Sequence, residues 1–593
     1  MAHLLIIGGA SSDILHISGQ VINTAGGAGI YTAMAARRCG VQVSLFGPRP
    51  EPFPEYLQSI NEHLSTWLGP EIRAEDLPRF EISYDQGQTE YLNYAIDAEA
   101  TMSTDMLPEN LSHYDLIHVT PLGDAEKQLD FIRACQQKGA KRISAGTGLM
   151  NTANQPAAVR AAFEESDYCF LNHLEATALF GTIDSVKTIP GRILFITLGV
   201  DGALVIQGNH VSKVPSIPCE VLDPTGAGDA FCGATGAYLA LGQHPNIAAR
   251  NASALAAETI AHVGPTALLW NKPPPSAPLD DRAVVNGDQV QKVANLVSNL
   301  PEITPFDFTG PVLPPAGHPL VLDWFFIATL QQFGFWTTDN GKYEQPLIAQ
   351  IAGKELKGSD FLWKAYLRIL QEDPEFFTNE RQADLSMDDM LDLFRADDGT
   401  HPMPALELHL AQARQYGQDM LALKLTPKMI LDQVQESTSP LRTFFEMLDK
   451  IGGYKEDPLR KKSGLLVFIL NQRPENFLQI EQDTTPVNDY HAMRACLRIG
   501  LVQIQDPGLH RKIVGRQVIL PEEEQAIRYA SYMAIEKVAS ISGKSMGAVD
   551  WFFFNSRKRC PEMTDPECPT CPVDPICAHD KDLFQPILRT TFY

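Results

Sequence analysis

The sequence predicts two domains: a doubly wound α/β domain in the N-terminal half and a mostly α-helical domain in the C-terminal half. Three observations lead to this prediction. A chain of 593 residues is too long for a single hydrophobic core. Short apolar runs alternate with helical patterns in the first half, which is typical of a parallel sheet covered on both faces. Beyond about residue 318, amphipathic helical patterns replace these glycine-punctuated runs.

The first half begins with an apolar run, residues 3–7, that ends in Gly8 and Gly9. This pattern predicts a buried strand followed by a turn that faces a ligand. Further along, the run 116–120 precedes a helical pattern over 124–137, and the run 168–171 leads into another helix start. Each pair has the sequence pattern expected for a strand followed by its crossover helix.

Composition limits the class of protein and of partner. Apolar residues make up 44% and charged residues 20% of the chain, as in soluble globular proteins. No apolar run is long enough to span a bilayer, and the first residues lack a basic leader, so we expect a cytoplasmic protein without a membrane partner. The net charge of −24 repels polyanions, so we expect small-molecule partners rather than nucleic acid.

A glycine-rich turn that ends in an acid indicates a phosphoryl-transfer centre. The segment DPTGAGD spans residues 223–229 and runs into an Ala-rich helical stretch. Gly226, Ala227 and Gly228 can present backbone N–H groups to an anion at a helix N-terminus. Asp229 would repel that anion unless it accepts a proton from an attacking hydroxyl. The alternative is an ordinary glycine-rich loop before a core helix.

The first 270 residues resemble the PfkB, or ribokinase-like, family of carbohydrate and nucleoside kinases. The segment 223–234 is similar to the family's C-terminal signature, and TAGGAG at residues 24–29 is similar to its N-terminal signature. The resemblance implies a ribokinase-like fold, ATP and Mg²⁺ as cofactors, and pairing of two copies through this half. It also implies that Asp229 is the catalytic base and that the Gly226–Gly228 amides form the anion hole.

The same resemblance assigns further residues to the kinase site. Asp13 would bind the hydroxyls of the sugar, although a turn-forming Asp is the simpler interpretation. One position departs from the pattern: the strand at 142–148 lacks the Asp that many sugar kinases have there, which leaves the substrate open. The remaining implied contacts are with sugar for Gly26 and Gly27, with Mg²⁺ and phosphates for Asn172 and Glu175, and with the nucleotide for Thr197 and Gly199.

A proline-rich stretch predicts the domain boundary. Residues 270–278 read WNKPPPSAP, and a second group of prolines lies between residues 301 and 315, with a short helical pattern at 288–300 between them. Such segments cannot continue a helix and favour an extended connector. We therefore predict a kinase domain over 1–270, a linker with a short helix over 271–317, and a helical domain over 318–593.

Four cysteines near the C-terminus predict a metal site. Cys560, Cys568, Cys571 and Cys577 lie in one proline-rich loop of a chain that we expect to be reduced. Four thiolates at this spacing bind zinc or an iron–sulfur cluster. The loop resembles the C-terminal 4Fe–4S loop of endonuclease III-type helix-hairpin-helix glycosylases, in which the first spacer is usually one residue shorter. The resemblance implies a 4Fe–4S cluster, with zinc as the alternative.

Upstream of this loop, residues 487–501 resemble the glycosylase segment in which an Asp at a helix start precedes two arginines. That resemblance makes Asp489 the residue that promotes cleavage of an N-glycosidic bond. The simpler interpretation of Asp489 is a helix N-cap.

A set of motifs between residues 333 and 554 also resembles the queuosine-salvage family, which shares the glycosylase-like fold. That family hydrolyses queuosine 5′-phosphate to queuine and ribose 5-phosphate, although its usual members lack the four-cysteine tail. The resemblance gives Asp489 the catalytic role, Lys461 a phosphate contact, and Phe335 and Trp336 a place near the base. Residues 333–336 could equally be core, and residues 460–462 an exposed basic face.

Together the two halves predict a bifunctional nucleoside salvage enzyme, in which a kinase makes the 5′-phosphate that a hydrolase then cleaves. Two alternatives for the second half stay open. It could be a DNA-repair glycosylase, for which the net acidity and the weak likeness of residues 448–453 to a DNA-gripping hairpin are unfavourable. It could also be a non-catalytic regulatory module with a structural metal.

Overall fold

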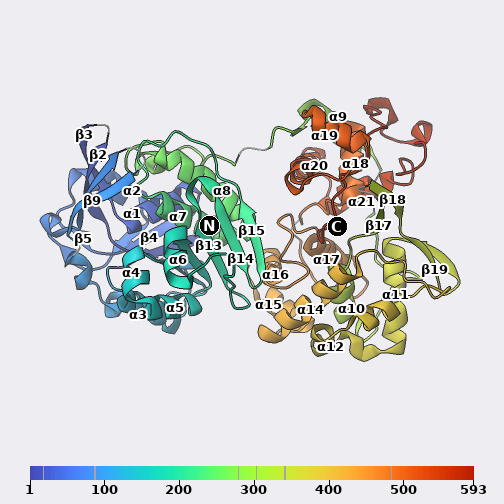
Figure 1. The fold of residues 1–593 in the computed structure, drawn as a ribbon, viewed down its shortest axis with the longest axis horizontal. Coiled ribbons are helices and arrows are strands. Elements are labelled where there is room, and N and C mark those ends of the chain that lie inside the picture. The colour runs from blue at the N-terminus through green and yellow to red at the C-terminus, as the bar shows by residue number, and fades with distance from the viewer. Residues whose placement is uncertain are drawn as a thin grey trace. The chain divides into compact units, whose positions relative to one another are not determined.

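The computed structural model describes residues 1–17, 19–85, 88–95, 97–277, 280–301, 304–339, 342–481 and 484–593. The chain forms two compact units, Met1–Ala277 and Pro278–Tyr593, which Figure 1 colours from blue to green and from green to red. None of the described helices is both long enough and apolar enough to cross a membrane.

The N-terminal unit is built on one large sheet. Within the described residues this sheet has nine strands in the order β15-β14-β13-β12-β11-β10-β1-β4-β6. Neighbours pair in parallel from β13 to β6, whereas β14 and β15 are antiparallel. The strands are β1 (His3–Ile7), β4 (Gln42–Phe46), β6 (Thr66–Leu68), β10 (Leu116–Val119), β11 (Ile143–Gly146), β12 (Tyr168–Asn172), β13 (Ile193–Thr197), β14 (Ala203–Gln207) and β15 (His210–Val214).

Helices cover both faces of this sheet, as Figure 1 shows. Alternate residues of β1 point to opposite sides: Leu4 and Ile6 enter one core, and Leu5 and Ile7 enter the other. The prediction of a doubly wound α/β domain is confirmed. One face carries α1 (Ala28–Arg38), α2 (Glu55–His63), α7 (Ala227–Ala240) and α8 (Pro245–Ile260), and the other carries α3 (Ala125–Gln137), α5 (Pro156–Glu164) and α6 (His173–Phe180), with α4 (Leu149–Asn154) packed against α5 and α6.

A second, four-stranded sheet in the order β3-β2-β8-β9 lies beside the first. Its strands are β2 (Ser11–Ile17), β3 (Gln20–Gly26), β8 (Arg79–Asp85) and β9 (Gln88–Ala95). Asp13 therefore stands within a strand, opposite Thr24 in β3, rather than in a turn. The short strands β5 (Arg49–Pro50) and β7 (Glu71–Ile72) form a separate parallel pair.

The C-terminal unit is mainly helical, as the amphipathic patterns predict. Its two-stranded ribbons are β16 (Ala283–Val285) with β21 (Val502–Ile504), β17 (Trp336–Asp339) with β18 (Lys342–Pro346), and β19 (Ile348–Ile351) with β20 (Lys354–Lys357). The helices are α9 (Gly287–Asn299), α10 (Val321–Leu330), α11 (Ser359–Glu372), α12 (Asn379–Ala383), α13 (Met387–Leu393), α14 (Leu406–Ala422), α15 (Pro427–Glu436), α16 (Pro440–Leu448), α17 (Lys461–Gln472), α18 (Tyr490–Ile499), α19 (Pro507–Val514), α20 (Pro521–Ser542) and α21 (Met546–Ser556).

Two apolar cores hold this unit together. One is formed mainly by α10, α11 and α14–α17, and the other by α9, α18, α20 and α21. Helix α9 lies within the segment that the sequence analysis assigns to a linker, yet its apolar residues Val290, Val293 and Val297 are buried in the second core. This segment packs because α9 has one apolar face, which needs a partner to be shielded from water.

Candidate functional site

In the N-terminal unit, the predicted phosphoryl-transfer residues stand at the start of α7. Gly226 is the N-cap residue of this helix and has a φ of 75°, a conformation that favours glycine. A Cβ on Gly226 would lie 2.2 Å from the ring of Tyr31, so close packing also requires glycine here. Asp229 lies in the first helical turn, where the N–H groups have no carbonyl of a preceding turn to bind.

Burial perturbs two acids in this region. Loss of hydration raises the pKa of Asp229 from its ordinary value of 3.8 to about 6. Burial also raises the pKa of Glu175 to about 7, and the neighbouring charge of Asp229 adds to that rise. The two carboxyls therefore lie close enough to repel each other, which is an arrangement that a divalent cation with oxygen ligands relieves.

Asn172 and Glu175 form a capping box at the start of α6. The Asn172 side chain accepts hydrogen bonds from the backbone N–H groups of Leu174 and Glu175 at 2.9 and 3.0 Å, and Glu175 accepts one from the Asn172 N–H at 2.8 Å. Asn172 also pairs with Thr197 at the carboxyl ends of β12 and β13. Gly199 follows Thr197, is exposed and has a φ of 61°. The sheet thus brings these four predicted residues to one edge.

The predicted sugar contacts stand at the second sheet. Asp13 is only 2% exposed, and its burial raises its pKa to about 6. A Cβ on Gly26 would lie 1.7 Å from Asp13 Oδ2, so Gly26 leaves the room that this carboxyl occupies. Gly27 is the N-cap residue of α1 with a φ of 94°. The structure therefore places Asp13 against Gly26, and Gly27 follows at the start of α1.

Two residues of this site were not predicted from the sequence. Tyr31 is buried, and its pKa is raised well above the ordinary value by burial and by the charges of Asp223, Asp13 and Asp229. Asp223 accepts hydrogen bonds from the backbone N–H groups of Thr225 at 3.0 Å and of Gly264 at 2.8 Å. Tyr31 therefore lies near both Asp13 and Asp229, which are far apart in the sequence.

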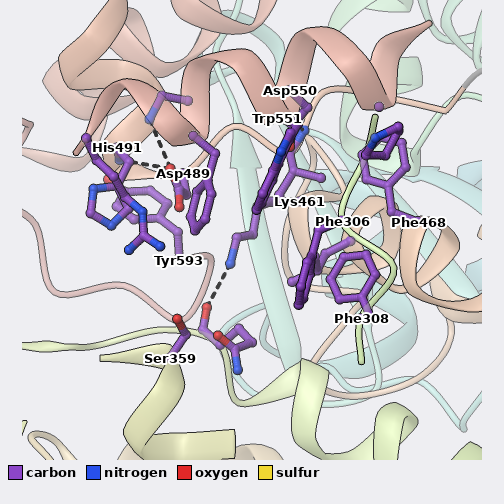
Figure 2. A pocket seen from close by; sticks show the side chains of 18 of the residues that line it. Phe306, Phe308, Ser359, Lys461, Phe468, Asp489, His491, Asp550, Trp551 and Tyr593 are labelled. Atoms are coloured by element: carbon purple, nitrogen blue, oxygen red, sulfur yellow. Dashed lines mark hydrogen bonds between the residues drawn. The ribbon is translucent and has the colours of Figure 1, made fainter. Parts of the chain in front are cut away.

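In the C-terminal unit, a cavity of about 240 Å³ contains three of the predicted residues: Phe335, Lys461 and Asp489 (Figure 2). They come from the segment before β17, the start of α17 and the start of α18. Figure 2 shows Lys461 and Asp489 facing the same space, with Trp551 and Phe306 on one side of Asp489 and His491 on the other.

Asp489 is the N-cap of α18 and lines the cavity at the same time. Its Oδ1 accepts hydrogen bonds from the N–H groups of His491 at 2.8 Å and Ala492 at 3.0 Å. These bonds fix the side chain but use only one of its two oxygens. Capping and a role in the cavity are therefore compatible.

Lys461 is buried and lines the same cavity as Asp489. Its Nζ donates a hydrogen bond to the Gln332 carbonyl at 2.9 Å, and burial lowers its pKa to about 8, against the opposing effect of Asp489. Its neighbours Arg460 and Lys462 are 7% and 1% exposed, so residues 460–462 are not an exposed basic face.

A further acid, Asp550, was not predicted as a site residue. It lines the cavity from α21 and accepts a hydrogen bond from the Val487 N–H at 3.0 Å. Burial and the adjacent charge of Asp489 raise its pKa well above the ordinary value. The cavity thus holds two neighbouring carboxyls, and one of them is favoured in the protonated form.

Aromatic side chains line much of the cavity. Phe306 stacks on Trp551 with 5.6 Å between ring centroids, and Trp551 stacks on Phe554 at the same distance. Phe335 is 6% exposed and lines the cavity, whereas Trp336 packs against Phe584 and lines a separate, much smaller cavity. The core interpretation therefore fits Trp336 better than it fits Phe335.

The four cysteines of the C-terminal loop, residues 560–577, are all partly exposed. Burial and the proximity of the other three thiols raise the pKa of Cys577. The Arg498 guanidinium lies 3.3 Å from Cys560 Sγ, and the His579 N–H lies 3.4 Å from Cys577 Sγ. In the described part of the chain, one group of three possible ligand atoms lies within 4.8 Å: those of Cys568, Asp574 and His579.

Comparison with known proteins identifies the N-terminal unit. Residues 7–272 match the model of the pfkB family carbohydrate kinases. A cytidine kinase of Thermococcus kodakarensis is 26% identical over 243 residues, which is 39% of this chain and 87% of that protein. A ribokinase of Bacillus subtilis is 31% identical over 118 residues, 20% of this chain and 40% of that protein.

Among solved structures, a probable sugar kinase from Rhizobium etli has 18% identity and a TM-score of 0.39, over 44% of this chain and 94% of that chain. The family match agrees with the α/β architecture of this unit. The N-terminal unit of this chain is a kinase domain of the PfkB family.

Proposed function

We propose that the chain is a two-step nucleoside salvage enzyme. The N-terminal unit transfers a phosphoryl group from ATP to the 5′-hydroxyl of a ribonucleoside, and the C-terminal unit hydrolyses the N-glycosidic bond of the 5′-phosphate. The observation that carries the second step is the single cavity that gathers Phe335, Lys461 and Asp489. A nucleoside substrate for the first step is supported by the relative named cytidine kinase.

In the kinase step, Asp229 accepts the proton of the attacking hydroxyl. Its pKa of about 6 leaves it largely deprotonated at neutral pH while keeping it more basic than an ordinary Asp. The N–H groups of the first turn of α7 bind the transferred phosphoryl group, where the helix dipole favours negative charge. Asp13 binds sugar hydroxyls from the second sheet.

Glu175 and Asn172 fit the place of a Mg²⁺ ion, because the carboxyl of Glu175 is buried beside Asp229 and gains from a neighbouring cation. Bound Mg²⁺ would supply charge compensation for the phosphates of ATP.

In the hydrolysis step, the C1′–N bond of the nucleotide breaks and water adds to C1′. Asp489 stabilises the positive charge that develops on the sugar and takes the proton of the attacking water. Asp550, favoured in its protonated form, donates its proton to the leaving nitrogen and recovers one from solvent. Phe306, Trp551 and Phe335 offer flat surfaces to the base, and base–aromatic stacking contributes about 1–3 kcal/mol per base in nucleic-acid complexes.

We propose queuosine or a related 7-deazaguanine nucleoside as the substrate. The support is the resemblance of residues 333–554 to the queuosine-salvage family, together with the aromatic lining of the cavity. The cavity volume of about 240 Å³ suits part of a nucleotide rather than a polymer.

The four-cysteine loop fits a 4Fe–4S cluster, with zinc as the alternative. Four thiols and two donors to sulfur, from Arg498 and His579, are the groups that hold and tune such a cluster. Four sulfurs around one zinc ion at 2.3 Å would lie about 3.8 Å apart. Among the described residues, the group of ligand atoms that lie within 4.8 Å of one another includes Cys568 but none of the other three cysteines. This wider spacing of the sulfurs favours a 4Fe–4S cluster over a single zinc ion. When bound, the cluster or zinc ion would cross-link the loop.

The test is mass spectrometry of the products formed from queuosine and Mg²⁺, with and without ATP, by anaerobically purified protein. We expect queuine only when ATP is present, the 5′-phosphate accumulating in Asp489→Asn, and no product in Asp229→Asn. If another nucleoside is phosphorylated while queuosine stays intact, the base assignment is wrong. If the bare nucleoside is hydrolysed without ATP, the coupling of the two steps is wrong.

A further inference from the structure

We propose that Arg557 forms the phosphate-binding subsite of the C-terminal cavity and makes it selective for a sugar phosphate over the unphosphorylated sugar. This inference rests on the proposed function of the cavity and adds a residue that neither the motifs nor the comparisons assign. The ligand class is the phosphate monoester of ribose or of a ribonucleoside.

The first observation is that Arg557 has no carboxylate partner among the residues that the structure describes. It lines the cavity at the end of α21, with its guanidinium 4.0 Å above the ring of Phe554. Its Nε is buried and has no hydrogen-bond partner among the described residues. The ion pairs of the described residues do not include Arg557, although its charge acts to lower the pKa of Asp360, which lines the same cavity. A partly buried cation without a counter-ion favours a bound anion.

Other buried arginines of this unit have partners, which sets Arg557 apart. Arg528 makes two hydrogen bonds of 2.8 Å to Asp457. Arg494 donates to Gln585 at 2.8 Å, and Arg498 donates to the Pro561 carbonyl at 2.8 Å. Because these arginines are engaged within the fold, Arg557 is the one best placed to bind a ligand.

The second observation is the order of side chains along α21. Asp550, Trp551, Phe554 and Arg557 all line the cavity, at the i, i+1, i+4 and i+7 spacing that places residues on one face of a helix. At 1.5 Å per residue, Asp550 and Arg557 are separated by about 10 Å along the axis. The helix therefore presents a carboxyl, then two aromatic rings, then a guanidinium to the cavity.

The third observation concerns the surroundings of Arg557. Burial and the charges of Arg494, Arg557, Lys357 and Lys461, in that order, hold the pKa of His491 well below its ordinary value. Glu562, which also faces this region, lies 3.2 Å from Lys357 Nζ and 3.6 Å from His491 Nδ1. The charges of four cations therefore act on His491, and two of these cations, Lys357 and Arg494, also lie within 4.0 Å of Glu562. Figure 2 shows Asp489 between His491 and the ring of Trp551.

These observations give the substrate an orientation. The base lies against Trp551 and Phe306, the scissile bond lies at Asp489, and the phosphate lies at Arg557. Lys461 uses one of its three N–H donors on the Gln332 carbonyl and can still contact the phosphate, while the planar guanidinium of Arg557 can bind two phosphate oxygens at once. A substrate without phosphate would leave Arg557 without an anion, so the cavity selects the product of the kinase step.

The experiment compares Arg557→Met with Lys558→Met, which removes a neighbouring exposed charge from the same segment. Ribose 5-phosphate, ribose and inorganic phosphate are titrated into each full-length protein by calorimetry. In the wild type and in Lys558→Met we expect ribose 5-phosphate to bind at least about tenfold more tightly than ribose, as a charge-assisted pair provides. In Arg557→Met that preference falls below about threefold. Binding by the N-terminal unit is common to all three proteins and cancels in the comparison.

An unchanged preference in Arg557→Met overturns the subsite. Equal metal content and thermal transitions show that both variants are folded, and Arg557→Lys, which restores a charge without the planar fork, should recover part of the preference. The measurements distinguish an error in the proposed phosphate subsite from an error in the proposed hydrolysis. If phosphate selectivity depends on Arg557 but no glycosidic bond is cleaved, the subsite stands and the hydrolase proposal falls. If the 5′-phosphate is cleaved with an unchanged KM in Arg557→Met, the reaction stands and the subsite falls.

Discussion

Replacing Asp229 by Asn should stabilise the N-terminal unit while abolishing phosphoryl transfer. Burial raises the pKa of Asp229 from 3.8 to about 6, so the folded state holds this proton more tightly than the unfolded chain does. Below about pH 4 the carboxyl is protonated in both states and does not oppose folding. As the pH rises towards 6, the unfolded chain loses this proton first, so the folded state becomes less stable relative to it. The shift corresponds to about 3 kcal/mol, or about 2–3 kcal/mol when its partial exposure is considered.

Asn has nearly the same shape and no charge, so Asp229→Asn removes this cost. It also removes the repulsion that raises the pKa of Glu175. At pH 8 the transition of the N-terminal unit should rise by about 5–10 °C, since 1 kcal/mol shifts a domain of this size by about 2–4 °C. The gain should shrink as the pH falls from 6 to 4.5.

Differential scanning calorimetry measures this effect, and the transition of the C-terminal unit is the internal reference. Asp130→Asn, an exposed acid of the same unit, is the matched control and should change little. A variant that is no more stable than the wild type at pH 8, or equally stabilised at pH 4.5 and pH 8, would refute the reasoning. Kinase assays on the same samples then test whether this acid is the base.

Three further predictions concern other parts of the chain. Gly26→Ala should raise the KM for the nucleoside at least about tenfold, because its Cβ would meet Asp13, whereas Gly148→Ala has room and should leave kinetics unchanged. Arg528→Met should destabilise the C-terminal unit by about 3–5 kcal/mol in denaturant titrations, since it leaves Asp457 buried without its partner. Adding Asp457→Asn should restore part of that loss, because Asn has no charge and still offers an acceptor to the Leu459 and Lys461 N–H groups. Replacing any one cysteine of the four-cysteine loop by Ser should lower iron and sulfide content, or zinc content, measured by elemental analysis.

The sequence predicted the main sheet of the N-terminal unit because its strands are buried on both faces and therefore read as continuous apolar runs. The second sheet was missed. Its strands β2 and β3 read SSDILHI and QVINTAG, which do not alternate regularly between polar and apolar residues, so they give only a weak strand signal. Tyr31 was missed for a different reason: a Tyr in an Ala-rich helix gives no sign of the acids that approach it from Asp13, Asp223 and Asp229.

In the C-terminal unit, motifs located Lys461 and Asp489, but local patterns could not show what surrounds them. Phe306 lies in the proline-rich segment that the composition assigned to a linker, although it stacks on Trp551 in the cavity. The local sequence around Asp550 gives no sign of its raised pKa, because that shift arises first from burial and then from the charge of Asp489, 61 positions earlier in the chain. Cavities formed by several helices are visible only after long-range packing is known.

The charge distribution narrows the class of ligand further. A net charge of −24 is unfavourable for binding a polyanion, whereas Arg557, which has no carboxylate partner among the described residues, attracts a single phosphate group locally. In the segment 448–453, which resembles a DNA-gripping hairpin, all residues except Lys450 are buried. A small molecule with a single phosphate satisfies both the repulsive surface and the attractive cavity, and a PfkB-type kinase acting on a nucleoside makes such a molecule. We infer that phosphorylation by the first unit is the feature by which the second unit recognises its substrate.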